Sequence, residues 1–228
     1  MKEFLNIFLD PSPVFRREQE TLRWWLPFAV LVAATMVVTF LYFDKVDTGW
    51  FLEQRILSSG REVSEQQLAA IRERTSGGGF MLWSATLGSG LSLGVVLLLF
   101  SGFFALVGKF SGTAVSFKQA LTLASWAHVP TLIHSLLMLI AVLGMSPQTS
   151  LESLSLTSVN ALFLDLQPDD RWFRLASSVS VLVPWTIFLT ALGWKQWTRA
   201  TSWLTPIVVA TVPHLVIYGG MAIGAMSG

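Results

Sequence analysis

The residues best suited to chemistry are three histidines, His128, His134 and His214, each set in a long uncharged stretch. An ionisable group inside a membrane marks a functional site by default, because its charge is costly there. Pro130 lies between the first two histidines and Pro213 precedes the third, and proline interrupts helical hydrogen bonding. These five residues are the candidates for an intramembrane polar site. The favoured alternative is that each histidine is buried and satisfied by Ser, Thr or a backbone carbonyl.

The surroundings of the histidines argue against metal binding and ion coupling. His128 and His134 are six residues apart, about 240° around a helix, so an unbroken helix points them to different sides. The chain has no cysteine, and no Asp or Glu falls within any of the long apolar stretches. Proton- and cation-coupled transporters usually carry an acidic residue at this depth. We therefore predict no metal site and no cofactor, and ion-coupled transport has no support.

A serine motif raises the question of catalysis. Ser92 lies between Gly90 and Gly94 in the G-x-S-x-G spacing of hydrolase nucleophile elbows. That motif needs a sharp strand-to-helix turn, whereas these residues sit inside an apolar stretch typical of a helix. An intramembrane serine hydrolase would also need a histidine base and an oxyanion site. It remains a minor alternative, and we predict no catalytic residue and no enzyme.

The elements that must position these residues are five apolar stretches, each long enough to cross a bilayer. Hydrophobic residues make up 53% of the 228 residues and charged residues only 13%, about half the share usual in soluble domains. Inside lipid, the backbone of such a stretch must make its hydrogen bonds within the stretch, so we expect helices. The prediction is an all-α membrane protein, a single domain over 1–228, with transmembrane helices at 24–43, 80–108, 120–145, 175–194 and 204–226.

Charge outside the helices predicts the orientation. Short, purely basic connections are typical of the cytoplasmic side, and two connections have this character. We predict that the N-terminus is cytoplasmic, that the C-terminus is extracytoplasmic, and that four basic side chains contact anionic lipid headgroups: Lys109, Lys118, Lys195 and Arg199. The net charge of +1 gives no support for a nucleic-acid partner.

The remaining segments are short. Residues 1–23 are predicted to form an amphipathic cytoplasmic segment resting on the inner leaflet, and no signal peptide is evident in them. Residues 44–79 form the largest connection, a small extracytoplasmic loop. Within this loop, Ser64 and Gln67 have the spacing of a capping box, which predicts a helix from there to about Arg74.

Glycine spacing provides the packing signal. Gly90 and Gly94 form one G-x-x-x-G pattern, and Gly220 and Gly224 form another. Such spacing lets two helix backbones approach closely in a membrane. The favoured interpretation is packing within the bundle, and the alternative is homo-oligomerisation through the last helix.

Three runs of sequence together resemble the Yip1 family of five-span membrane proteins. They are DPSPVFR at 10–16, SFKQAL at 116–121 followed by AHVP at 127–130, and WTIFLTALGW at 185–194. Only 23 residues precede the first helix, so the resemblance is to a bacterial inner-membrane member rather than to the longer eukaryotic trafficking proteins. For eukaryotic members the resemblance implies membrane organisation and binding of prenylated small GTPases; for bacterial members it implies little beyond the fold.

The functional prediction is a non-enzymatic membrane scaffold, adaptor or membrane-organising factor. Its expected partners are membrane lipids and a second copy or another membrane protein. The main alternative is a small-molecule, lipid or ion pathway, resembling a transporter or channel, lined by His128, Pro130, His134, Pro213 and His214. That alternative predicts a polar cavity between the third and fifth apolar stretches.

Overall fold

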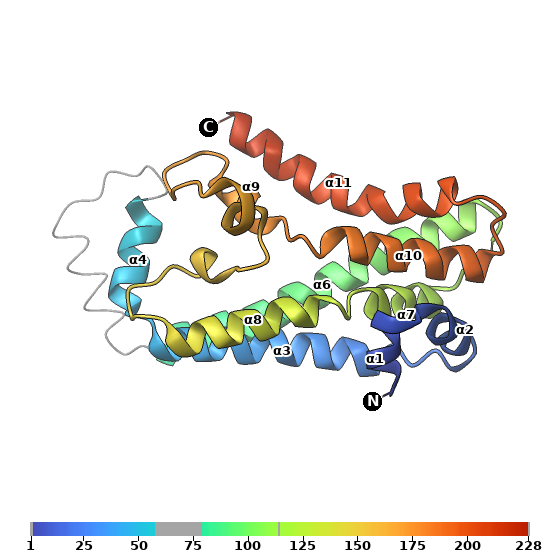
Figure 1. Cartoon of the computed structure of the whole chain (residues 1–228), viewed down its shortest axis with the longest axis horizontal. Coiled ribbons are helices and arrows are strands. Elements are labelled where there is room, and N and C mark those ends of the chain that lie inside the picture. The colour runs from blue at the N-terminus through green and yellow to red at the C-terminus, as the bar shows by residue number, and fades with distance from the viewer. Residues whose placement is uncertain (1, 58–78, 114, 228) are drawn as a thin grey trace.

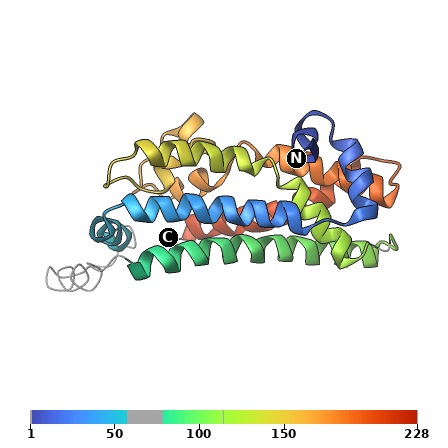
Figure 2. The same ribbon diagram turned by 90° about the horizontal axis from the view of Figure 1, so that it is seen from below.

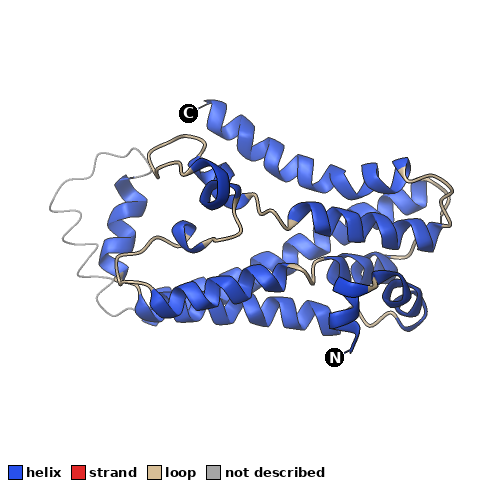
Figure 3. Ribbon diagram, in the orientation of Figure 1, coloured by secondary structure: helices blue, strands red, loops and turns tan. Residues whose placement is uncertain are grey.

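The protein is an elongated helical bundle, shown by a computed structural model that describes residues 2–57, 79–113 and 115–227 (Figures 1 and 3). The α-helices are α1 Lys2–Leu9, α2 Pro11–Thr21, α3 Trp25–Lys45, α4 Thr48–Leu57, α6 Gly79–Phe110, α7 Phe117–Ala127, α8 Thr131–Gly144, α9 Phe173–Ser178, α10 Val183–Thr198 and α11 Leu204–Ser227. Two short turns of helix, Glu152–Leu154 and Asn160–Leu164, lie between α8 and α9. The prediction of an all-helical membrane protein is confirmed.

Three helices of the described residues, α3, α6 and α11, are long and apolar enough to cross a membrane. The pair α7 and α8 passes the same test as one bent span, with an angle of 45° at the break. Figure 2 shows α3 and α6 running side by side along the long axis. The described residues therefore contain three or four candidate spans, where the sequence predicted five continuous helices.

The predicted helix at 120–145 is bent because of its proline. α7 begins with a complete capping box, in which Ser116 and Gln119 exchange hydrogen bonds, and ends at Ala127. Pro130 has no N–H to continue the ladder and stands at the start of α8. The turn is closed by the N–H of Thr131, which donates to the carbonyl of His128 at 2.9 Å.

The prediction of one continuous helix at 175–194 is wrong. α9 ends at Ser178, residues 179–182 are extended or turned, and α10 starts at Val183. Pro184 lies in the first turn of α10, where proline is favoured because its missing N–H would be unbonded there anyway. The gap instead pairs with residues 157–159, and Ser158 and Ser180 form an isolated antiparallel bridge.

The N-terminal segment packs into the bundle, a contact that the sequence analysis did not predict. Ile7 of α1 and Phe15 of α2 are both 0% exposed. The ring of Phe4 lies 5.2 Å from that of Trp126 in α7, and the indole N–H of Trp197 in α10 donates to the carbonyl of Phe15 at 2.8 Å. The two N-terminal helices thus cover the end of the bundle formed by α7 and α10.

The opposite end of the bundle carries α4, the 145–172 connection and α9 (Figure 1). α4, at 48–57, is a helix in the connection between the first two long helices that the sequence analysis did not predict. The helix predicted from Ser64 to Arg74 falls outside the described residues. At this end the hydroxyl of Tyr42 donates to the carbonyl of Thr149 at 2.9 Å, tying the connection to α3.

Candidate functional site

Two of the predicted histidines meet where α7, α6 and α11 approach one another. The rings of His128 and His214 are nearly parallel, with centroids 6.3 Å apart. Phe100 of α6 presents an edge contact to both, at 5.4 and 5.1 Å. This arrangement requires the chain to bring together residues 86 positions apart, which the sequence pattern alone does not specify.

Both of these histidines are satisfied by their own helices. Nδ1 of His128 lies 2.7 Å from the carbonyl oxygen of Ala124, and Nδ1 of His214 lies 3.1 Å from that of Ala210. A carbonyl only accepts, so Nδ1 carries the proton in each neutral ring and Nε2 is left as an acceptor. The predicted interpretation, in which buried histidines bond to backbone carbonyls, describes these two rings.

The third histidine belongs to a separate network of three hydrogen-bonded side chains. Nδ1 of His134 lies 2.6 Å from the hydroxyl oxygen of Thr157, and the hydroxyl of Ser180 donates to the same oxygen at 3.0 Å. The hydroxyl of Thr157 thus links the side chain of Ser180 to the ring of His134. This network joins α8, the 155–159 segment and the gap before α10.

The 155–160 segment is the largest feature that the sequence analysis missed. It is not α-helical along its length, yet its backbone is paired: the N–H of Val159 donates to Val179 at 2.8 Å, and the N–H of Val181 donates to Thr157 at 2.9 Å. Its polar side chains are buried, namely Ser155, Thr157, Ser158 and Asn160. Irregular backbone is tolerated where it is buried and its polar groups are paired, and the density of Ser and Thr between 153 and 160 was the available signal.

An open groove of about 380 Å³ lies between this segment, the start of α10 and α11. Its lining is mainly aliphatic, with polar groups from Ser180, Thr211, His214 and Tyr218. Of the five predicted site residues, only His214 lines it. Pro130 is buried in the turn before α8 and Pro213 is buried within α11, so the predicted set divides among two polar clusters and the two proline positions.

The predicted packing glycines fall into two classes. Gly90 and Gly94 pack within the bundle: a Cβ at Gly90 would meet Met36 of α3 at 2.7 Å, and one at Gly94 would meet Phe28 at 3.4 Å. A Cβ at Gly220 or Gly224 would have no atom within 4 Å, and both residues are exposed. Intramolecular packing therefore uses the glycines of α6 and leaves those of α11 open.

The four predicted headgroup residues lie at the end of the bundle that also holds α1 and α2. Lys109 and Lys118 are exposed, at the end of α6 and the start of α7. Arg199 is exposed in the left-handed turn after α10. The amine of Lys195 donates to the carbonyl of Ala200 at 2.6 Å and closes that turn.

Ser92 lies on an exposed face in the middle of α6, without the strand-to-helix turn of a nucleophile elbow. The Nδ1 atoms of the three histidines are bonded to Ala124, Thr157 and Ala210 instead. The described residues thus supply no histidine hydrogen bond to Ser92.

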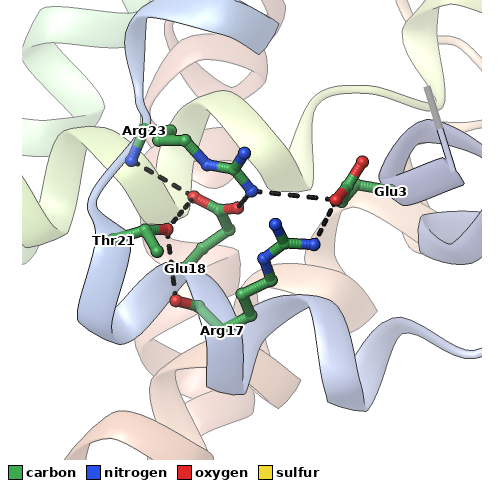
Figure 4. A network of polar contacts seen from close by, with 5 residues as sticks. All are labelled: Glu3, Arg17, Glu18, Thr21 and Arg23. Atoms are coloured by element: carbon green, nitrogen blue, oxygen red, sulfur yellow. Dashed lines mark hydrogen bonds and ion pairs between the residues drawn. The ribbon is translucent and has the colours of Figure 1, made fainter.

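A charged network that the sequence analysis did not identify holds α1, α2 and the start of α3 together (Figure 4). Glu18 of α2 is 0% exposed and accepts from the guanidinium of Arg23 at 2.6 Å and from the hydroxyl of Thr21 at 2.9 Å. Leu22 adopts the left-handed conformation, which turns the chain so that Arg23 can reach back. Glu3 of α1 pairs with Arg17 and lies 3.8 Å from Arg23.

The network shifts the pKa values of two of its members. The side-chain hydrogen bond to Glu18 raises the pKa of Arg23. A backbone hydrogen bond, with a further contribution from the positive charge of Arg17, lowers the pKa of Glu3 below its ordinary value of 4.5. Both shifts favour the charged forms, so α1, α2 and the start of α3 are held together at neutral pH.

Comparison with known protein families gives a match that covers nearly the whole chain. Residues 5–224 match the Yip1 domain. No curated protein and no solved structure matches the chain.

Proposed function

This chain belongs to the Yip1 family of multi-pass membrane proteins, and from that premise we propose that it is a scaffold that assembles with a second copy of itself through α11. The family is generally non-enzymatic, and the resemblance found from the sequence is confirmed by the domain match. The proposed role is to organise membrane lipids and proteins rather than to transform a substrate.

The observation that carries this proposal is the open glycine face of α11. Ile217, Gly220 and Gly224 share one face of the helix, and all three are exposed. In a membrane, helix association depends on close packing because the lipid is as apolar as the side chains. A face with two glycines that no neighbouring side chain covers can pack closely against another helix.

A second copy is the favoured occupant because the face can pair with itself. Two α11 helices related by a two-fold axis would place the same glycines opposite one another, which gives a closed dimer. The glycines of α6, by contrast, are already filled by Met36 and Phe28 of α3. The proposal therefore concerns α11 alone.

The test is native mass spectrometry on the full chain in nanodiscs. The wild-type protein is expected at twice its 25.2 kDa mass. Gly220→Leu combined with Gly224→Leu fills the face, and the expected result is a monomer. Gly88→Leu is the matched control, because Gly88 is also exposed with no atom within 4 Å of a Cβ. A dimer that persists in the double variant would contradict the proposal.

The orientation belongs to the same proposal. We place the end holding α1, α2, Lys109, Lys118 and Arg199 in the cytoplasm of a bacterial cell, against the inner membrane. What supports this is that the two short connections at that end carry basic residues and no acidic ones, which is typical of the cytoplasmic side and attracts anionic lipid. The pair α9 and α10 then provides the fifth, interrupted crossing, and the C-terminus is extracytoplasmic.

A further inference from the structure

We propose that the groove between α10 and α11 binds an uncharged lipid that carries a hydroxyl group, such as a long-chain alcohol. The groove lies beside the gap at 179–182, and His214 and Tyr218 line its α11 wall. The inference does not depend on self-association, because the groove is complete within one copy of the chain.

The polar groups of the groove leave one acceptor and one hydroxyl to be satisfied. The hydroxyl of Ser180 already donates to Thr157, and that of Thr211 donates to the carbonyl of Ile207 at 2.7 Å. The Nδ1–H of His214 donates to the carbonyl of Ala210, so Nε2 of the same ring is free to accept a hydrogen bond. Tyr218 lies one helical turn away with its ring 6.4 Å from His214, and its hydroxyl has no hydrogen-bond partner among the described residues.

A ligand hydroxyl matches this pair. It would donate its proton to Nε2 of His214 and accept the phenolic proton of Tyr218, so both groups would be satisfied at once. Unsatisfied polar groups are costly away from water, which gives the pair its selectivity for a hydroxyl over a bare hydrocarbon.

The charge of the lining excludes an ionised ligand. The described residues around the groove include no Lys, Arg, Asp or Glu. His214 is the eleventh of the 24 residues of α11, which places it about 15 Å from the first residue of the helix and about 20 Å from the last. A carboxylate or phosphate held there would have no counter-ion in a medium that disfavours charge.

The size and opening of the groove suit one lipid chain. Its volume of about 380 Å³ is near the lower end of the range of roughly 300–1,000 Å³ found for ligand sites. The aliphatic wall includes Val159, Val179 and Ile187. Val181 is 39% exposed and Leu215 63% exposed at the rim, so the groove opens sideways toward lipid. A ligand can therefore enter from the bilayer.

The proposal is tested by photo-crosslinking of the full chain in phosphatidylcholine nanodiscs at pH 8. Two probes are compared, a sixteen-carbon alcohol and the acid of the same chain length, each with a diazirine and an alkyne handle. We expect the alcohol to label peptides from 155–187 and 204–227, and the ionised acid to label them far less. Excess unlabelled hexadecanol should displace the alcohol probe.

Three variants assign the labelling to the groove. Tyr218→Phe removes the phenolic donor, and we expect labelling by the alcohol to fall about fivefold, the effect of one lost hydrogen bond. Tyr42→Phe is the matched control, since its hydroxyl bonds Thr149 at the other side of the bundle, and labelling should be unchanged. Val181→Trp fills the rim and should reduce labelling further.

Circular dichroism and gel filtration report whether each variant folds. If Val181→Trp does not fold, Tyr218→Phe and displacement by hexadecanol decide the question. Equal labelling by alcohol and acid, labelling that Tyr218→Phe leaves unchanged, or labelling mapped outside the groove would each overturn the proposal.

Discussion

At the residue scale, the three histidines differ in how far along the chain their partners lie. His128 and His214 use carbonyls four residues earlier, so any helix placed there would satisfy them. His134 depends on Thr157, 23 residues away. The first kind of contact follows from helical geometry, whereas the second exists only after the 155–160 segment has folded against α8.

A single glycine controls how closely α2 approaches α10. A Cβ at Gly193 would overlap Leu123 and would lie 2.9 Å from Phe15. We predict that Gly193→Ala lowers stability by about 1–3 kcal/mol through overpacking. The measurement is thermal unfolding in detergent, followed by tryptophan fluorescence.

The control for that substitution is Gly102→Ala in α6. A Cβ at Gly102 has no atom within 4 Å, and alanine is the better helix former by about 1 kcal/mol. The control should therefore unfold at an unchanged or higher temperature. Equal melting temperatures for the two variants would mean that the approach of α2 is looser than the structure shows.

The carboxylate of Glu3 makes the docking of α1 dependent on pH. Because the folded pKa of Glu3 is lowered, its contribution is fully present above the ordinary value of 4.5 and is lost as the pH falls through the lower, folded value. We predict that α1 loosens in acid. A spin label at position 5, where Leu5 is 66% exposed, should become more mobile on going from pH 7 to pH 3.

Glu3→Gln serves as the reference for the acid experiment. With its charge removed at every pH, the variant should show a loosened α1 at pH 7 and little further change in acid. A label whose mobility follows the same pH curve in wild type and variant would assign the effect to another group.

At the element scale, the interrupted pair α9 and α10 is held by the segment that pairs with its gap. Backbone hydrogen bonds join Val159 to Val179 and Thr157 to Val181. The hydrogen-bonded side chains of His134, Thr157 and Ser180 lie beside them. Neither half of the pair is long enough to cross a membrane alone, since α10 has 16 residues. The element therefore exists only as part of the bundle.

Removing one hydroxyl tests that dependence. Thr157→Val keeps the shape of the side chain but leaves His134 and Ser180 without their shared partner, at a cost of about 1–3 kcal/mol. We predict faster hydrogen exchange at amides 155–160 and 179–182, with α3 and α6 unchanged. Exchange that stays as slow as in wild type would show that the backbone pairing suffices without the hydroxyl.

The same element shows how far sequence reasoning reaches. Long uncharged stretches predicted α3, α6 and α11 closely, because lipid requires the backbone to bond within each helix. The stretch at 175–194 looked equally helical, and its interruption depends on partners about 20 residues earlier that hydropathy does not detect. The histidine contacts to local carbonyls were anticipated as a class, whereas Thr157, Ser180 and Tyr218 were not, since each acts through tertiary contacts.

At the scale of the whole molecule, the connections α6–α7 and α10–α11 and the N-terminal helices share one end, and the C-terminus lies toward the other (Figure 1). The chain contains no cysteine, so single cysteines report topology without background. We predict that a cysteine at Ser202, in the α10–α11 turn, is protected from a membrane-impermeant maleimide in intact cells, and that one at Ser150 is labelled. The reverse pattern, or the same outcome at both sites, would contradict the proposed orientation.

The docking of α1 and α2 has a consequence for synthesis. These helices leave the ribosome before the helices that they bind, because their binding surface includes Trp126, Gly193 and Trp197, the last of which is made some 180 residues after Phe15. Chains begin to fold from the N-terminus as they are made, but here α2 is made long before its partners in α10. A ribosome stalled before codon 193 would hold a chain whose α2 has not yet reached its place against α10.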